Sequence, residues 1–253
     1  MALNKIMYID EVYEQLVKEV LTDGVQRDTR NGKTLSVFGT SIKFDMAETG
    51  LPLLSYRKIF TKGVVGEFLG FLQDAKTVEE FEALGCPYWK LWADKNGKLE
   101  LDYPPRKQWD ALIEGIKKDP GSRRHMINLW NSERLDKLSL PCCHFNYQFY
   151  VRNGFLDLIW TQRSLDVAIG LPSDLILSAL YLSEIGRKTG LTPGKVTMNF
   201  GDTHIYQEHL QAIEDMITYR IPNHSRIKFN WDGEKLEYYD YFPYDKIDFE
   251  LKR

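Results

Sequence analysis

Two adjacent cysteines and a histidine stand directly before a segment with the composition of a β-strand. Residues 147–151 are aromatic and β-branched, which predicts a strand, and residues 141–144 (Pro-Cys-Cys-His) precede it. A thiolate carried at the mouth of a rigid strand is well placed to act as a nucleophile. Free cysteines are more often small buried hydrophobic residues, and this stretch alone leaves both interpretations open.

The same stretch resembles the active-site segment of thymidylate synthases, which is Pro-Cys-His, three further residues and Gln-Phe-Tyr-Val. Cys143-His144 and Gln148-Phe149-Tyr150-Val151 match it in register, and Cys142 stands one position before the expected nucleophile. The resemblance extends, with small gaps, from about Tyr8 to about Leu210. It implies that Cys143 is the nucleophile, that His144 lies beside it, and that Gln148 helps to bind the substrate.

Two more residues correspond to the acid–base groups of that family. Glu67 lies in a predicted helix over residues 63–72 that is apolar nearly all round. A carboxylate in such a helix is costly to bury unless it has a hydrogen-bonding or charged partner or a catalytic role. Tyr103 stands where the family has a proton-relay tyrosine, although Pro104 replaces the glycine that normally follows. Gly66 and Gly70 stand where the family has bulky residues, which predicts looser packing beside Glu67.

Five residues are expected to bind the nucleotide phosphate. Arg30 lies in a turn over residues 28–32, and Arg163-Ser164 belong to a Gln-Arg-Ser-x-Asp-Val block like that of the family. A guanidinium and a hydroxyl both donate to phosphate oxygens. Arg123 and Arg124 follow a turn and are predicted to open a strand, where adjacent side chains point to opposite faces. The resemblance implies that this pair reaches across a homodimer into the neighbouring site.

The resemblance also assigns a sugar site and a folate site. His204 and Tyr206, in a Gly-Asp-x-His-x-Tyr match, would hold the 3′-hydroxyl of a deoxyribose. The co-substrate implied is 5,10-methylenetetrahydrofolate, and its expected contacts are Arg57, Trp89, Trp92, Asp166 and Gly170. Tryptophans in a core are as compatible with this pattern as tryptophans against folate. The C-terminal segment, residues 244–253, is charged where the family ends in an apolar lid, which predicts a less watertight closure.

Asp174 departs from the asparagine with which the family recognises uracil. An ionised aspartate can only accept hydrogen bonds, so it would clash with O4 of uracil and accept from the 4-amino group of cytosine. The sequence therefore favours dCMP as substrate and a 5-hydroxymethyl product, as in the phage dCMP hydroxymethylases that share this aspartate. A protonated Asp174 that still binds dUMP remains open. So do a methyl product, a dUMP hydroxymethylase, and an inactive nucleotide- or RNA-binding relative.

The elements expected to position these residues form a mixed α+β fold. Patterning predicts helices over residues 8–21, 63–72 and 175–189 and strands over 34–38 and 147–151. The resemblance implies one catalytic domain over residues 1–253, with a large twisted mixed β-sheet packed against helices and lying at the dimer interface.

Composition restricts the class of protein. The chain has 253 residues, 43% of them hydrophobic and 27% charged, and a net charge of −3 that gives no reason to expect nucleic-acid binding. Three cysteines without zinc spacing predict a reducing, cytoplasmic setting and no metal site. No apolar run approaches the roughly 18 residues of a membrane span.

Overall fold

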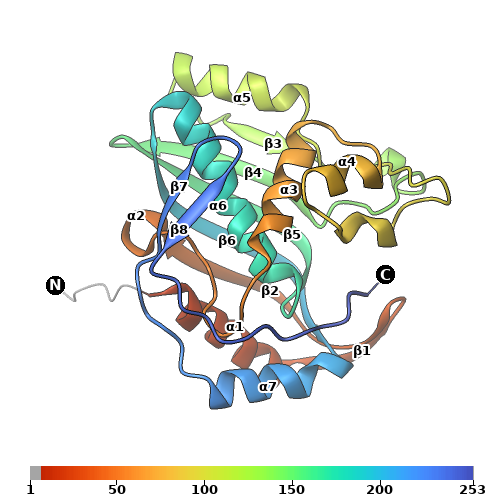
Figure 1. Cartoon of the computed structure of the whole chain (residues 1–253). Helices are drawn as coiled ribbons and strands as arrows, with labels where there is room; N and C mark the ends of the chain where they lie inside the picture. Colours follow the sequence, from red (N-terminus) through yellow and green to blue (C-terminus); the bar gives the residue numbers. More distant parts are fainter. Residues whose placement is uncertain (1–6, 253) are drawn as a thin grey trace.

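A six-stranded mixed β-sheet forms the centre of the structure, a computed structural model that describes residues 7–252 (Figure 1). Its order is β1-β2-β6-β5-β4-β3; β5 and β6 pair in parallel and the other neighbours antiparallel. A two-stranded hairpin, β7–β8, lies apart from it. The strands are β1 (Val25–Thr29), β2 (Gly32–Asp45), β3 (Met126–Asn128), β4 (His144–Arg152), β5 (Phe155–Asp166), β6 (Thr192–Tyr206), β7 (Lys228–Trp231) and β8 (Leu236–Tyr239).

The α6 helix connects the parallel strands β5 and β6 and packs against both (Figure 1). It is buried nearly all round, because the sheet covers one side of it and α3 the other. The expected mixed α+β fold is therefore confirmed. The helices are α1 (Ile9–Asp23), α2 (Met46–Thr49), α3 (Thr61–Leu72), α4 (Val78–Ala83), α5 (Lys107–Lys118), α6 (Gly170–Thr189) and α7 (Leu210–Tyr219), with short 3-10 turns η1 (Tyr88–Leu91), η2 (Ser132–Arg134) and η3 (Gln207–His209).

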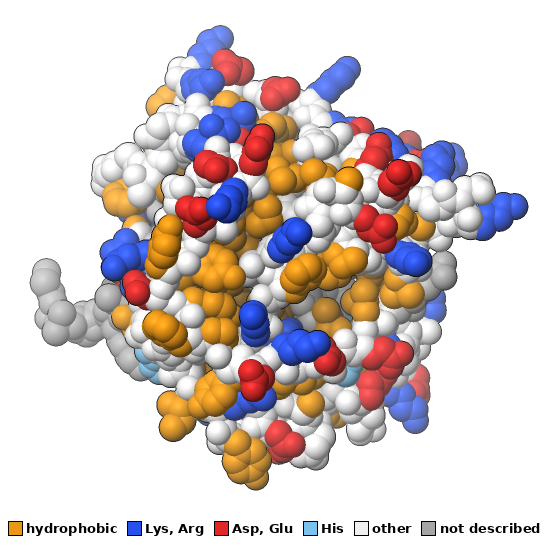
Figure 2. Space-filling model, in the orientation of Figure 1, with side chains coloured by type: hydrophobic (Ala, Val, Ile, Leu, Met, Phe, Trp, Pro, Cys, Tyr) orange, Lys and Arg blue, Asp and Glu red, His pale blue; other side chains and the backbone are white. Residues whose placement is uncertain are grey.

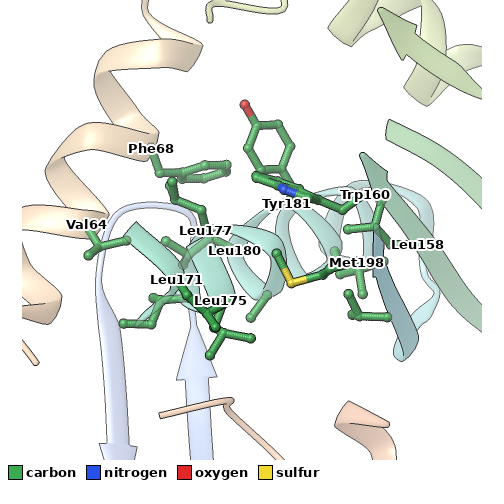
Figure 3. Packing of buried hydrophobic residues seen from close by; sticks show 14 of the residues in the cluster. Val64, Phe68, Leu158, Trp160, Leu171, Leu175, Leu177, Leu180, Tyr181 and Met198 are labelled. Carbon is green, nitrogen blue, oxygen red and sulfur yellow. The ribbon is translucent and has the colours of Figure 1, made fainter. Parts of the chain in front are cut away.

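Side chains alternate between the two faces of the sheet. Leu158 and Trp160 on β5 are buried against α6, whose Tyr181 lies over Trp160 (Figure 3). Between them, Ile159 is 41% exposed on the opposite face, and Tyr150 on the paired strand β4 is 59% exposed there. The inner face thus forms the core with the helices, whereas the outer face presents apolar side chains to the surface.

The glycines on α3 do not loosen the packing, so that expectation was wrong. A Cβ on Gly66 would lie 2.4 Å from the carbonyl oxygen of Leu84, and one on Gly70 would lie 2.3 Å from the ring of Phe81. The missing side chains therefore allow α4 and the turn after it to approach α3 closely, and the two glycines add no space to the cavity that Glu67 lines.

Two element boundaries also differ from expectation in ways that move site residues. The α6 helix begins at Gly170 and not at Leu175. Pro172 does not prevent this, because the backbone N–H that proline lacks would have no partner within the helix in its first turn. Asp174 is therefore a helical residue. Arg123 and Arg124 lie in the loop before β3 and not on a strand, so strand alternation does not orient them.

Candidate active site

A cavity of about 570 Å³ opens where the ends of β4, β5 and β6 meet the first turns of α6 and the C-terminal segment. Over the face in view in Figure 2, acidic and basic side chains are intermingled with hydrophobic ones. Most of the predicted site residues line this cavity, from separate parts of the chain: Arg30, Arg57, Glu67, Trp89, Trp92, Tyr103, Cys143, His144, Arg163, Ser164, Asp166, Gly170, Asp174, His204 and Tyr206.

Cys143 is held by two neighbours at the start of β4. Its backbone N–H donates to the hydroxyl of Tyr103 (2.9 Å), and Arg163 Nη2 lies 3.8 Å from its sulfur. Arg163 cannot swing away easily, because its Nε donates to the Cys142 carbonyl (2.9 Å) and its Nη2 to the Pro141 carbonyl (2.8 Å). The guanidinium is therefore fixed beside the sulfur, where it favours a thiolate.

The pKa of Cys143 is nevertheless raised, contrary to the expected lowering by arginines. Burial is the largest cause, and it outweighs the opposing effects of Arg163 and of Tyr103. In the ligand-free protein the sulfur thus carries its proton at neutral pH.

Glu67 enters the cavity from α3. Burial raises its pKa from 4.5 to about 8, the nearby carboxylate of Asp174 adds to the shift, and the indole N–H of Trp89 opposes it. The side chain is therefore a neutral acid at pH 7 and can donate a proton to a bound molecule.

Asp174 is 7% exposed and is oriented by a glutamine from β5. Gln162 Nε2 donates to Asp174 Oδ2 (2.7 Å) and to the Ser164 carbonyl (3.1 Å), while Gln162 Oε1 accepts from Trp160 Nε1 (3.0 Å). The indole N–H can only donate, so it determines which end of the Gln162 amide faces Asp174. Burial raises the pKa of Asp174 from 3.8 to about 7; the Gln162 bond opposes the shift and Asp166 adds to it.

Several polar side chains lie at the ends of β5 and β6, beside the β1–β2 turn. His204 Nδ1 lies 2.8 Å from Asp202 Oδ1, and the His204 and Tyr206 rings meet edge to face with centroids 5.2 Å apart. Asp166 Oδ1 accepts from the backbone N–H groups of Ala168 (2.8 Å) and Ile169 (3.2 Å), which leaves its second oxygen for another partner.

Aromatic rings line the opposite end of the cavity. Trp89 packs between Trp92 (centroids 5.5 Å apart) and Tyr103 (5.4 Å). Phe60 and Tyr88 also lie there. These rings give this part of the cavity the aromatic lining that a fused ring system would need.

The C-terminal segment covers part of the cavity. Residues 247–249, 251 and 252 line the cavity, and the segment runs past α1 in Figure 1. Phe249 lies beneath the guanidinium of Arg57 (5.2 Å to the ring centroid) and edge to face with His209, and Lys252 pairs with Glu208. The charged segment therefore does cover the site, through one aromatic anchor and one ion pair.

The thymidylate synthase family model matches residues 11–252 of this sequence. The chain belongs to the thymidylate synthase family. Membership makes it a C5 one-carbon transferase of pyrimidine nucleotides, in a family that uses methylenetetrahydrofolate. Between residues 7 and 252 no cluster of three His, Cys, Asp or Glu side chains could hold a metal ion. No helix in that range is long and apolar enough to cross a membrane.

Three residues that the resemblance to thymidylate synthases assigned to substrate lie away from the cavity. Gln148 pairs with Ile159 across β4 and β5, which places it on the outer face of the sheet. Arg123 and Arg124 are exposed, and Arg124 lines a separate surface hollow beside α5. Within one copy of this thymidylate synthase homologue, Arg30 and Arg163 are the predicted phosphate-binding arginines that reach the cavity.

Several cavity residues were missed by reasoning from the sequence. Gln162 orients Asp174, Ser173 and Asn31 place polar groups in the wall, and the C-terminal segment supplies a cover. Gln162 could have been found, because it shares the inward face of β5 with Leu158 and Trp160, where a polar residue needs a partner. Contacts of the C-terminal segment have no signal in the local sequence.

Proposed function

We propose that this member of the thymidylate synthase family is a dCMP 5-hydroxymethylase. It would convert dCMP, methylenetetrahydrofolate and water into 5-hydroxymethyl-dCMP and tetrahydrofolate. The observation that carries this proposal is the hydrogen bond from Gln162 to Asp174, because it determines what the cavity offers to position 4 of the pyrimidine.

Asp174 presents one oxygen to the substrate. Its Oδ2 already accepts from Gln162 at 2.7 Å, so Oδ1 is the atom left for the base. When the side chain is ionised, Oδ1 is a pure acceptor that matches the 4-amino group of cytosine and opposes the O4 acceptor of uracil. A buried polar mismatch of this kind costs about 1–3 kcal/mol, which is roughly one to two decades in relative affinity.

A second candidate substrate follows from the pKa of the same residue. Because that pKa is about 7, a fraction of the protein carries a proton on Asp174 at neutral pH. Since Oδ2 accepts from Gln162, the proton would sit on Oδ1 and could donate to O4 of uracil. Turnover of dUMP is therefore the alternative activity, and it belongs to the protonated form of the enzyme.

The remaining groups would then have distinct roles. Cys143 adds to C6 of the ring, which makes C5 nucleophilic, and Arg163 stabilises the sulfur anion as the proton leaves. Glu67, a neutral acid at pH 7, delivers a proton to the ring and later returns to the acid form. Tyr103 holds the backbone of the nucleophile, while Arg30, Arg163 and Ser164 bind the phosphate and His204 and Tyr206 the sugar.

The aromatic end of the cavity fits a folate. Its fused ring would stack near Trp89 and Trp92, and its ring N–H groups match the free oxygen of Asp166. Arg57 also has a buried Nε without a partner among the described residues, although its Nη2 donates to the Ala168 carbonyl. Methylenetetrahydrofolate supplies the one-carbon unit when bound there.

The choice of product depends on whether water reaches the exocyclic carbon on C5. Asp248 and Lys252 of the C-terminal segment and Ser173 of α6 place polar groups in the cavity wall, and a wall of that kind supports ordered water. The glycines of α3 contribute nothing to this, since they are closely packed. The polar wall supports hydroxymethyl transfer over hydride transfer, which needs a dry site.

A homodimer would complete the phosphate site. The outer face of the sheet exposes Tyr150 and Ile159, and a second copy packed there would bury them. Arg123 and Arg124 are exposed and have no ion-pair partner among the described residues, so they are available to a neighbouring cavity.

One set of assays tests the proposal. Tritium release from C5-labelled dCMP and dUMP gives substrate preference, absorbance at the wavelength of dihydrofolate gives the redox outcome, and product mass separates hydroxymethyl from methyl. We expect faster release from dCMP, no dihydrofolate and a hydroxymethyl product. Stoichiometric dihydrofolate would refute hydroxymethyl transfer, and equal or faster release from dUMP at pH 8 would refute the assignment of substrate.

A further inference from the structure

The ring of His144 is enclosed by aromatic side chains next to the nucleophile. It is 4% exposed, with ring centroids 4.5 Å from Trp160 and 4.7 Å from Tyr103. Its Nδ1 is hydrogen-bonded to the hydroxyl of Tyr147, three residues along β4. Since His144 lines the cavity and Nδ1 is taken, Nε2 is the ring nitrogen left to face a bound molecule.

Tyr147 is fully buried, so its hydroxyl hydrogen must find a partner inside the protein. Its ring stacks on Trp160 (centroids 4.5 Å apart, planes 27° apart) and contacts Tyr181 (5.0 Å). The Tyr181 hydroxyl lies near that of Tyr147 but does not make a hydrogen bond of standard geometry with it. Nδ1 of His144 is therefore the acceptor with hydrogen-bond geometry for the Tyr147 hydrogen.

We propose that Tyr147 is a positioning residue that fixes His144 as the Nε2–H tautomer, so that the ring presents a hydrogen-bond donor to the cavity. In the other tautomer Nδ1–H would donate to Tyr147, and the hydroxyl hydrogen would have only the poorly placed Tyr181 oxygen as an acceptor. A buried donor without a good acceptor should lower the population of that tautomer by about tenfold or more.

The assignment determines what His144 does in the reaction, and in that respect it rests on the proposed function. Burial lowers the pKa of His144 to about 3, so the ring remains neutral across the working range. A neutral ring with its proton on Nε2 cannot accept a proton from the substrate. It can donate to a water or to a ring substituent beside Cys143. Proton acceptance falls to ionised Asp174, and to Glu67 after it has given up its own proton.

The tautomer is measurable without turnover. Protein labelled with ¹⁵N in its five histidines gives, in long-range proton–nitrogen correlation, separate signals for protonated and unprotonated ring nitrogens. The His144 signals are assigned by through-bond correlation or by their loss in His144→Gln. We expect an unprotonated Nδ1 and a protonated Nε2. A protonated Nδ1, or two averaged nitrogens, would overturn the proposal.

Two matched variants test the cause. Tyr147→Phe removes the hydroxyl on Nδ1 but keeps the ring stack, and it should give averaged or exchanged nitrogen signals. Tyr181→Phe removes a neighbouring buried hydroxyl that is not bonded to His144, and it should leave the signals of the unmodified protein unchanged. If both variants change the nitrogen signals alike, the effect is one of packing and the role of Tyr147 is lost.

Kinetics then separate positioning from binding. In Tyr147→Phe we expect kcat for tritium release from labelled dCMP to fall about five- to tenfold, with KM for the nucleotide unchanged within about twofold. A change confined to KM would contradict the proposal. If the nitrogen signals are as expected but dCMP is not turned over, the proposed function fails and the tautomer assignment stands.

Discussion

Replacing Asp174 by asparagine should convert a cytosine-binding cavity into a uracil-binding one. The reason lies in the fixed orientation of Gln162, whose Nε2 donates to Oδ2 because Oε1 accepts from the indole of Trp160. An asparagine must therefore turn its carbonyl oxygen toward Gln162. Its amide nitrogen then takes the place of Oδ1 and donates to whatever occupies position 4 of the ring.

The size of the effect follows from two hydrogen-bond mismatches, one with uracil in the unmodified protein and one with cytosine in the variant. The unmodified protein pairs an acceptor with the cytosine amino group and opposes uracil O4, whereas Asp174→Asn does the reverse. At about 1–3 kcal/mol for each mismatch, the ratio of kcat/KM for dCMP to that for dUMP should fall by at least about thirtyfold. A matched control is Asp215→Asn, since Asp215 also accepts from a glutamine amide (Gln211 Nε2, 2.9 Å) but is exposed on α7.

The same ratio should depend on pH in the unmodified protein. Asp174 has a pKa of about 7, so it is an acceptor above that pH and a possible donor to uracil below it. The ratio for dCMP over dUMP should rise by up to about a hundredfold between pH 6 and pH 8, because the ionised fraction rises about tenfold while the protonated fraction falls about tenfold. Tritium release at saturating folate measures both substrates in one assay. A ratio that is flat with pH, or an Asp174→Asn ratio within about threefold of the unmodified protein, would refute the reasoning.

Three further predictions test the nucleophile, the buried acid and the glycines. Mass spectrometry of the complex trapped with 5-fluoro-dCMP and folate should find the adduct on Cys143; Cys143→Ser should lose it and Cys142→Ser keep it, and a label elsewhere would contradict the mechanism. Glu67 and Asp174 have pKa values of about 8 and about 7 in the folded protein, well above those of the unfolded chain. Their protonation therefore favours the folded state by on the order of a few kcal/mol below pH 4, and this contribution is lost as pH rises toward 8. Urea unfolding between pH 5 and pH 8.5 should show that fall, and an equal slope in Glu67→Gln would argue against it. Gly70→Ala should lower the free energy of unfolding by about 1–3 kcal/mol, because the added Cβ meets Phe81. Gly115→Ala should raise it by about 0.5–1 kcal/mol, because its Cβ would lie 3.6 Å from the His125 ring, an ordinary contact distance. Similar urea midpoints for the two variants would contradict the packing argument.

Local patterns in the sequence predict the elements that carry the site. Residues 147–151 lie in β4, 34–38 in β2 and 63–72 in α3, because aromatic and β-branched alternation or helical apolar spacing dominates each. The start of α6 was predicted five residues late, since a Gly-x-Pro segment resembles a turn when it is also compatible with a first helical turn. Helix boundaries of this kind depend on packing against residues that are distant in the sequence, which a short stretch of sequence does not contain.

The members of the cavity follow from the family resemblance, whereas their electrostatics do not. Arg163 lies beside Cys143 as expected, yet the pKa of the thiol rises because burial outweighs one guanidinium. The glycines of α3 seemed to offer space until the distance to Phe81 showed that a neighbouring helix fills it. In both cases the sign of the effect depends on how closely other parts of the chain approach, which residue types alone do not specify.

Base recognition here depends on a pair of residues and not on Asp174 alone. A free carboxylate could rotate, exchange its two oxygens and share a proton between them, so it would accept from cytosine or donate to uracil with little preference. Gln162 removes that freedom by occupying one oxygen, and Trp160 in turn removes the freedom of Gln162. It follows that Gln162→Leu, which leaves Oδ2 without its donor, should raise the pKa of Asp174 and free the carboxyl to rotate and carry its proton on either oxygen. Preference should then shift toward dUMP while position 174 stays unchanged. If Gln162→Leu keeps the preference for dCMP at pH 8, the carboxylate acts alone and the hydrogen bonds from Trp160 through Gln162 to Asp174 have no role in recognition.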